Sequence, residues 1–206
     1  MGRRGISRRK ALTSALALGG VTVALAAQVA AERRRELPAD RMRPPGALRE
    51  ADFLDACVRC GLCMQACPFD TLHLAGLGAA LPVGTPYFVA RETPCYMCED
   101  MPCAAACPTG ALDVANIGAA RMGLARLSAP ERCFSYTGTA YCDSCFQACP
   151  IKGRAIRMQH GRTPRGGSFQ PAVDADFCTG CGKCEDACIL QGDAAITVSA
   201  NHATRR

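Results

Sequence analysis

The stretch Cys57-Val-Arg-Cys-Gly-Leu-Cys-Met-Gln-Ala-Cys-Pro68 places four cysteines within 11 residues and closes on a proline. Related stretches occur three more times, and the successive fourth cysteines lie 40, 42 and 39 residues apart. This regular spacing is typical of a repeat protein with a unit of about forty residues. The four motifs contain all 16 cysteines of the 206-residue chain: Cys57, Cys60, Cys63 and Cys67; Cys95, Cys98, Cys103 and Cys107; Cys133, Cys142, Cys145 and Cys149; Cys178, Cys181, Cys184 and Cys188.

Thiols spaced this tightly have three interpretations: disulfides, zinc or iron-sulfur clusters. Cysteines separated by only two residues form strained loops when they pair with one another, which argues against disulfides. Structural zinc sites commonly use two cysteine pairs set well apart. The run Cys-x2-Cys-x2-Cys-x3-Cys-Pro is the bacterial ferredoxin motif for 4Fe-4S clusters, in which the fourth cysteine binds a neighbouring cluster. We therefore predict that the sixteen cysteines bind the iron of four 4Fe-4S clusters.

The last two cysteines of the first motif predict how two clusters are brought together. Cys63 and Cys67 lie four residues apart, so on a short helix they share a face, with Cβ atoms about 6 Å apart. One helical turn then contacts two clusters. Proline follows the fourth cysteine at positions 68, 108 and 150 and stops this helix, whereas the last motif has Ile189 there. Gly61 and Gly182 stand where the backbone must approach a cluster.

A short segment of alternating character follows each motif and predicts an edge strand. These segments are residues 71–75, 111–115, 155–158 and 195–198. The combination predicts an α+β fold of two ferredoxin-like modules, each with two clusters. Two pairings fit: neighbouring motifs pair, first with second and third with fourth, or the first and fourth pair around a second–third module. We favour the latter, because motifs one and four share the compact spacing.

The segments around the motifs suggest a domain organisation. Residues 32–50, rich in proline and charge, predict a linker, and residues 201–206 a tail. Residues 51–200 form the expected four-cluster domain, and the polar stretch 160–170 predicts a surface loop inside it. The repeat units are expected at about residues 51–80, 88–118, 128–160 and 172–200.

Residues 1–31 predict an export signal. Arg8 and Arg9 precede an alanine- and glycine-rich run, residues 11–31, that carries no charge. A paired arginine before a moderately apolar run resembles a twin-arginine signal, a route that exports proteins with their cofactors already bound. An ordinary secretory leader and a membrane helix are the alternatives, since 21 residues are long enough to span a bilayer. We expect a periplasmic protein, either cleaved after Ala31 or attached to the inner membrane.

Charge and residue types exclude two classes of function. The formal charge is +6, but beyond residue 31 only 19 basic residues face 18 acidic ones, so no nucleic-acid surface is expected. The three histidines, His73, His160 and His202, are widely spaced and none lies beside a nucleophile. No phosphate loop or dinucleotide fingerprint is present. We therefore expect an electron-transfer subunit without a catalytic site of its own.

Several stretches resemble the MauM/NapG family of ferredoxin-type proteins. They are Arg43-Pro-Pro-Gly-Ala-Leu48, Phe53-Leu-Asp-Ala-Cys-Val-Arg-Cys60, the order of the four cysteine spacings, and Cys178-Thr-Gly-Cys-Gly-Lys-Cys184, and the resemblance covers residues 43–198. It implies four 4Fe-4S clusters, twin-arginine export and a membrane ferredoxin-type partner that oxidises quinol. It also implies that electrons pass to a periplasmic reductase, with nitrate reductase expected, directly or through a haem protein.

Three alternatives remain open from the sequence. The family resemblance also fits an electron-transfer role in methylamine oxidation. An iron-sulfur subunit of another molybdenum reductase would carry similar motifs. A maturation or scaffold protein, in which the clusters are structural, is the alternative from a different class.

Overall fold

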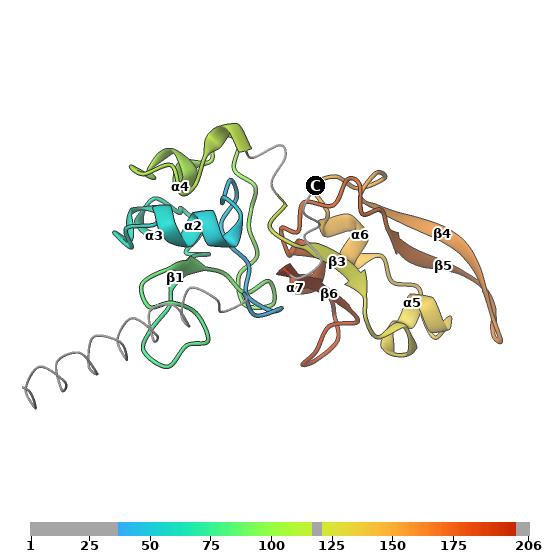
Figure 1. Ribbon diagram of the computed structural model, residues 1–206. Coiled ribbons are helices and arrows are strands. Elements are labelled where there is room, and N and C mark those ends of the chain that lie inside the picture. The colour runs from blue at the N-terminus through green and yellow to red at the C-terminus, as the bar shows by residue number, and fades with distance from the viewer. Residues whose placement is uncertain (1–36, 117–120, 201–206) are drawn as a thin grey trace, which may run out of the picture. The chain divides into compact units, whose positions relative to one another are not determined.

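The computed structural model describes residues 37–116 and 121–200 (Figure 1). Its helices are α2 (Glu50–Ala56), α3 (Leu62–Gln65), α4 (Pro102–Ala105), α5 (Phe134–Thr137), α6 (Ser144–Ala148) and α7 (Lys183–Asp186). Its strands are β1 (His73–Leu74), β2 (Pro86–Tyr87), β3 (Leu124–Leu127), β4 (Ile156–Thr163), β5 (Gly166–Val173) and β6 (Ile196–Ser199), and its 3-10 turns are η1 (Val114–Asn116) and η2 (Pro130–Arg132). The expected signal segment and tail lie outside the described residues. Within these two ranges, no helix is long and apolar enough to cross a membrane.

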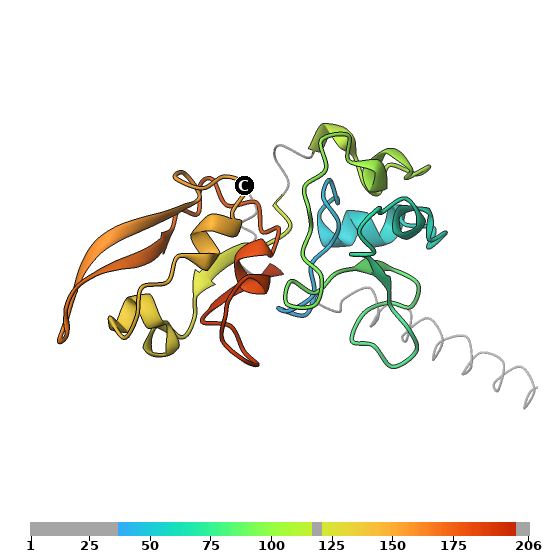
Figure 2. The ribbon, with the colours of Figure 1, turned by 180° about the vertical axis from the view of Figure 1, so that it is seen from behind.

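The same order of elements occurs twice. Module one, residues 37–116, contains α3, the hairpin β1–β2 and α4, and module two, residues 121–200, contains α6, the hairpin β4–β5 and α7. In each module the segment before the first motif pairs antiparallel with the segment after the second, through an Ala47–Leu112 bridge in module one and through β3 and β6 in module two. Figure 1 and Figure 2 show the two motif helices of each module side by side. This repeated α+β plan fits two ferredoxin-like modules.

The strands expected after the motifs are found in three of four places. β1 lies within residues 71–75, β4 includes residues 156–158, and β6 overlaps residues 195–198. The prediction for residues 111–115 is wrong, because only Leu112 pairs and the chain then enters η1. The Asp113 carboxylate accepts a hydrogen bond of 2.9 Å from the Ala115 N–H, and such a local bond competes with strand pairing.

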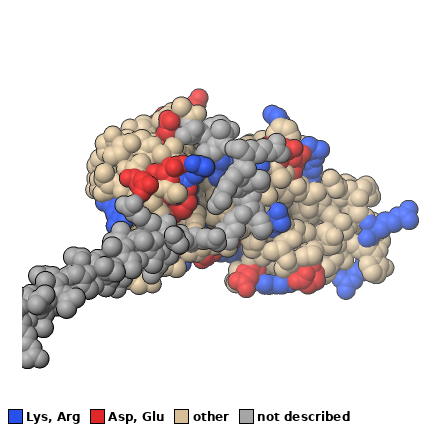
Figure 3. Space-filling model, in the orientation of Figure 1, with Lys and Arg blue, Asp and Glu red and all other residues tan. Residues whose placement is uncertain are grey.

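The loop expected over residues 160–170 is instead part of the longest hairpin. β4 and β5 pair along their full length, from Ile156 opposite Val173 to Thr163 opposite Gly166, and only Pro164 and Arg165 form the turn. The stretch does lie on the surface, and Figure 3 shows Lys and Arg side chains at its outer end. Its polar composition hid the strands because a two-stranded ribbon buries little apolar surface of its own.

The linker expected over residues 32–50 ends earlier than predicted. Residues 42–46 are buried, and Met42 exchanges backbone hydrogen bonds of 3.0 and 2.9 Å with Phe88. The Arg43 guanidinium donates to both carboxylate oxygens of Glu50, at 3.0 and 2.6 Å, and to the Pro86 carbonyl at 2.7 Å. Composition alone indicated a linker because these charges find their partners only in the folded chain.

Arg43→Met is expected to destabilise module one strongly. The Glu50 carboxylate, 22 % exposed, and the Pro86 carbonyl would both lose their donor. Breaking a buried ion pair on one side costs about 3 kcal/mol, which for a chain of this length lowers the melting temperature by roughly 10 °C. Arg49→Met is the control, because the Arg49 side chain is 78 % exposed in its pair with Asp52. Thermal unfolding of both variants tests this, and equal losses would contradict it.

Cysteines make up much of the buried core. Its fully buried large side chains are Met42, Phe53, Phe88, Ile156 and Ile196. The same cluster contains Cys63, Cys95, Cys103, Cys178, Cys181 and Cys184. Because only 5 % of the residues are aromatic, the chain buries little large apolar surface, and small domains of this kind commonly rely on bound metal for stability. The thiols therefore lie where a metal group would complete the core.

Candidate metal centres

Module one brings its two cysteine motifs together through α3 and α4, which pack against each other. The Cys63 thiol lies near Cys57 of its own motif and near both Cys103 and Cys107 of the other. The Cys103 thiol lies near Cys98 of its own motif and Cys67 of the other. The fourth cysteine of each motif is thus exchanged, as the ferredoxin motif predicts. We assign Cys57, Cys60, Cys63 and Cys107 to site 1, and Cys67, Cys95, Cys98 and Cys103 to site 2.

Module two repeats this exchange through α6 and α7. The Cys145 thiol lies near Cys133 and Cys142 of the third motif and near Cys188 of the fourth. The Cys184 thiol lies near Cys178 and Cys181 of the fourth motif and near both Cys145 and Cys149 of the third. We assign Cys133, Cys142, Cys145 and Cys188 to site 3, and Cys149, Cys178, Cys181 and Cys184 to site 4. The long gap after Cys133 is taken up by α5, so Cys133 still reaches its group.

The pairing that we favoured from the sequence, first motif with fourth, is wrong. Each module pairs neighbouring motifs, and its hairpin, β1–β2 or β4–β5, connects the two. The compact spacing shared by motifs one and four describes how each loop curls around its own site. It carries no information about which helices pack together.

Left-handed backbone starts three of the motif helices. Gly61 and Gly182, with φ of 77° and 88°, precede α3 and α7, and Met101, with φ of 43°, precedes α4. These residues turn the chain sharply from the ligand loop into the helix, which glycine does without steric cost. A Cβ on Gly182 would also lie 2.7 Å from the Ala90 Cβ. The approach of these two glycines to a cluster stays a prediction, and at Gly182 the structure shows a close approach to Ala90 of module one.

Backbone N–H groups point at several of the thiols. The Ala125 N–H donates to Cys178 Sγ at 3.5 Å, and the Leu112 N–H donates to Cys107 Sγ at 3.4 Å. At Cys107, burial raises the pKa, but hydrogen bonds from Leu112 and Thr109 outweigh it and lower the pKa below its usual value. Such donors stabilise a thiolate and are among the groups that set the potential of an iron-sulfur cluster.

Burial acts in the opposite direction on the central thiols. It raises the pKa of Cys63 and Cys103 to about 11 and that of Cys95 and Cys145 to about 12, with the neighbouring cysteines adding to the shift. The pKa of Cys184 is raised well above its usual value for the same reason. Since only the thiolate binds metal, these cysteines need a strong cationic partner to ionise.

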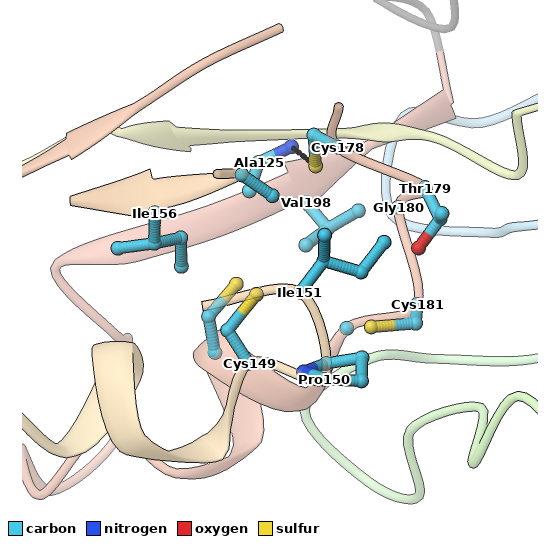
Figure 4. Close-up of a pocket in the computed structure, with 13 residues that line it drawn as sticks. Ala125, Cys149, Pro150, Ile151, Ile156, Cys178, Thr179, Gly180, Cys181 and Val198 are labelled. Carbon is cyan, nitrogen blue, oxygen red and sulfur yellow. Dashed lines mark hydrogen bonds between the residues drawn. The ribbon is translucent and has the colours of Figure 1, made fainter. Parts of the chain in front are cut away.

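The four cysteines of site 4 line one hollow together with apolar residues. Figure 4 shows Cys149, Cys178 and Cys181 around it, with Ile156 and Val198 on the same lining. Four thiols, apolar walls and a backbone donor at Cys178 match what a 4Fe-4S cluster requires. The donor set of this site therefore fits the group that the sequence predicts.

Among the described residues, no three His, Cys, Asp or Glu side chains lie close enough together to bind a single metal ion. A zinc ion needs its sulfur ligands about 2.3 Å from one centre. A 4Fe-4S cluster has an iron at each of four corners with a separate cysteine for each, so its thiols stand farther apart.

Sites 2 and 4 meet where the two modules touch. The Cys95 N–H of site 2 donates a hydrogen bond of 2.8 Å to the Cys181 carbonyl of site 4. Tyr96, the next residue, stacks on Phe69 with ring centroids 4.0 Å apart, and Lys183 Nζ lies 4.2 Å from the Tyr96 centroid. The two modules are therefore connected directly through residues of their ligand loops.

Fold and cysteine groups together define a ferredoxin-type protein with 4Fe-4S dicluster domains. The family described as 4Fe-4S dicluster domain matches residues 56–111 and 140–191 of this chain. The first match contains motifs one and two, and the second contains motif four and most of motif three. Cys133 precedes the second match, but the structure places it near Cys145, as the third motif predicts.

Comparison with curated proteins shows the particular family. The chain is 52 % identical to the methylamine utilization ferredoxin-type protein MauM of Methylorubrum extorquens, over 93 % of this chain and 88 % of the relative. It is 49 % identical to the ferredoxin-type protein NapG of Escherichia coli, over 90 % and 81 %, and 48 % identical to MauM of Paracoccus denitrificans, over 96 % and 89 %. The chain belongs to the MauM/NapG family of ferredoxin-type proteins.

Proposed function

We propose that this protein is an electron carrier that holds four 4Fe-4S clusters, one in each of sites 1 to 4. The observation that carries the proposal is that the fourth cysteine of each motif lies near thiols of the partner motif in both modules, which supports an exchange of ligands. Zinc sites and disulfide scaffolds have no need of this exchange, whereas it is the way in which a ferredoxin holds two clusters close together. When bound, a 4Fe-4S cluster supplies one-electron transfer at a potential set by its surroundings.

The residues of the chain have distinct tasks in this proposal. The sixteen thiolates hold iron, and backbone donors such as the Ala125 N–H stabilise the negative charge on sulfur. Ile156 and Val198, which are nearly fully buried, keep water away from site 4. The contact between Cys95 and Cys181 holds sites 2 and 4 near each other, so that all four sites form one connected set.

We further propose that the chain is exported by its twin-arginine segment and works in the periplasm, in solution or attached to the inner membrane. Its electron donor would be a membrane ferredoxin-type protein that oxidises quinol. Its acceptor would be a periplasmic reductase, with nitrate reductase proposed, reached directly or through a haem protein. The residues of the N-terminal segment and the family resemblance support these assignments. A role in methylamine oxidation is the second candidate, supported by the relatives named for methylamine utilization.

Metal analysis of protein purified without oxygen tests the proposal directly. We expect about sixteen iron and sixteen acid-labile sulfide per chain, because each 4Fe-4S cluster uses four cysteines. About four zinc and no sulfide would mean a structural metal protein and would overturn the electron-carrier function.

The variant Cys181→Ser distinguishes an electron relay from a scaffold protein with structural clusters. In a relay, Cys181→Ser is expected to reduce electron flux from reduced quinol to the acceptor while the protein still binds its partners. In a scaffold, the same substitution would abolish partner binding, and flux through the wild-type clusters would be absent.

A further inference from the structure

Arg91 of module one lies against the end of α7 in module two. Its guanidinium donates to the carbonyls of Glu185, Asp186 and Cys188, at 2.6, 3.1 and 3.0 Å. It also donates to the carbonyls of Leu190 and Gly192, at 2.5 and 3.2 Å. All five acceptors are backbone oxygens of one short stretch, 94 to 101 residues away in the sequence. Arginine suits this arrangement because it presents five N–H donors in one rigid plane.

The stretch that Arg91 contacts contains the one exchanged cysteine that no proline follows. Cys67, Cys107 and Cys149 precede Pro68, Pro108 and Pro150, whose ring fixes the backbone just beyond the ligand. Cys188 precedes Ile189, which is 54 % exposed. In the described part of the chain, no backbone hydrogen bond is donated by residues 189–192. The Arg91 contacts therefore take the place of the missing proline as the restraint on this segment.

The end of α7 gives these contacts a further reason. The last carbonyls of a helix have no partner within the helix and favour a cation nearby. α7 is only four residues long, so its end includes Glu185 and Asp186, and the chain then passes through Cys188. A guanidinium that binds the carbonyls on both sides of Cys188 fixes the direction in which that thiol points toward site 3.

We propose that Arg91 of module one is a positioning residue for site 3. It holds Cys188, the ligand that motif four contributes to the site of motif three. This inference rests on the proposed 4Fe-4S function and adds a dependence of the third cluster on the first module. It also predicts that the positive charge of Arg91 raises the reduction potential of that cluster, because a cation stabilises the more negative, reduced state.

The test is Arg91→Ala in the full-length protein, purified without oxygen, with iron counted and each cluster followed by electron paramagnetic resonance during a redox titration. We expect the iron content to fall from about sixteen toward about twelve per chain, since one cluster of four is affected. In chains that retain the cluster, one signal should shift to a lower potential. That signal should be the one abolished by Cys188→Ser and left unchanged by Cys60→Ser.

Three comparisons make the result decisive. Arg132→Ala is the matched control, because Arg132 carries a charge next to Cys133 but makes only one hydrogen bond, of 3.4 Å, to the same stretch; it should retain full iron content. Arg91→Lys should lie between the wild type and Arg91→Ala and guards against general misfolding. Adding Arg91→Ala to Cys188→Ser should cause no further loss, since the two residues act on one ligand.

An unchanged third cluster in Arg91→Ala, or an equal loss at all four sites in Arg91→Lys, would overturn the inference. A wild-type protein that contains no iron would instead overturn the proposed function, so the two failures are distinguishable.

Discussion

Cys67→Ser and Cys103→Ser are expected to abolish the same cluster, and Cys63→Ser and Cys107→Ser the other cluster of module one. The reason is the exchange through α3 and α4, which puts Cys67 near Cys103 and Cys107 near Cys63. Each single substitution should remove one signal of four from the resonance spectrum and up to about four iron from the chain.

Two other arrangements of motifs and clusters predict different losses. If each motif held its own cluster, as four independent metal sites would, Cys63→Ser and Cys67→Ser would remove the same signal. If motif one paired with motif four, Cys67→Ser would share its lost signal with Cys184→Ser. Spectra of these variants, recorded at equal protein concentration after checking the fold by circular dichroism, separate the three arrangements.

Gly180→Ala is expected to be the most damaging change outside the ligands. Gly180 has φ of 75°, and a Cβ there would overlap the backbone N, C and O atoms of Gly123. Backbone cannot yield as a flexible side chain does, so the ligand loop of motif four would have to move away from the segment that leads into β3. Left-handed strain and overpacking together cost about 3–4 kcal/mol. The displacement would also weaken the Ala125 N–H bond to Cys178.

Gly153→Ala provides the matched control for this prediction. Gly153 has φ of 82°, close to that of Gly180, but a Cβ there would meet no atom within 4 Å. It should cost only about 1 kcal/mol, the strain of a left-handed residue. Thermal unfolding and iron content should therefore separate the two variants clearly, with loss of iron in Gly180→Ala alone. Equal losses of stability and iron in the two variants would contradict the prediction that the close approach of Gly180 to Gly123 is needed.

Local sequence determined most of the chemistry. The spacing of Cys57, Cys60 and Cys63 requires a tight loop, because only such a loop lets three nearby thiols reach one cluster. The four-residue separation of Cys63 and Cys67 predicted that one helical turn would serve two sites. In the structure Cys63 lies on α3, and Cys67, just after the helix, lies near Cys103 of the other motif. The sequence favours this arrangement because it depends on distances along a few residues, which the backbone geometry of a turn restricts closely.

Where the sequence prediction failed, partners distant in the chain decided the outcome. Residues 42–46 form a buried segment because Arg43 finds Glu50 and Pro86, and residues 160–170 form strands because β4 finds β5. Nothing in the sequence near Arg91 indicates five carbonyls about a hundred residues away. The absence of proline after Cys188 was the one signal that another restraint was needed there.

The sequence by itself predicted the ligands and the kind of cluster that they suit, and it determined the repeat and the family. Only the tertiary structure decided which motifs share their fourth cysteine, how the ligand loops of the two modules meet at Cys95 and Cys181, and which side chain restrains Cys188. The physical reason is that ligand spacing is a local constraint on a few dihedral angles. The pairing of motifs instead depends on which helices bury their apolar faces against each other, a contact that no single segment encodes.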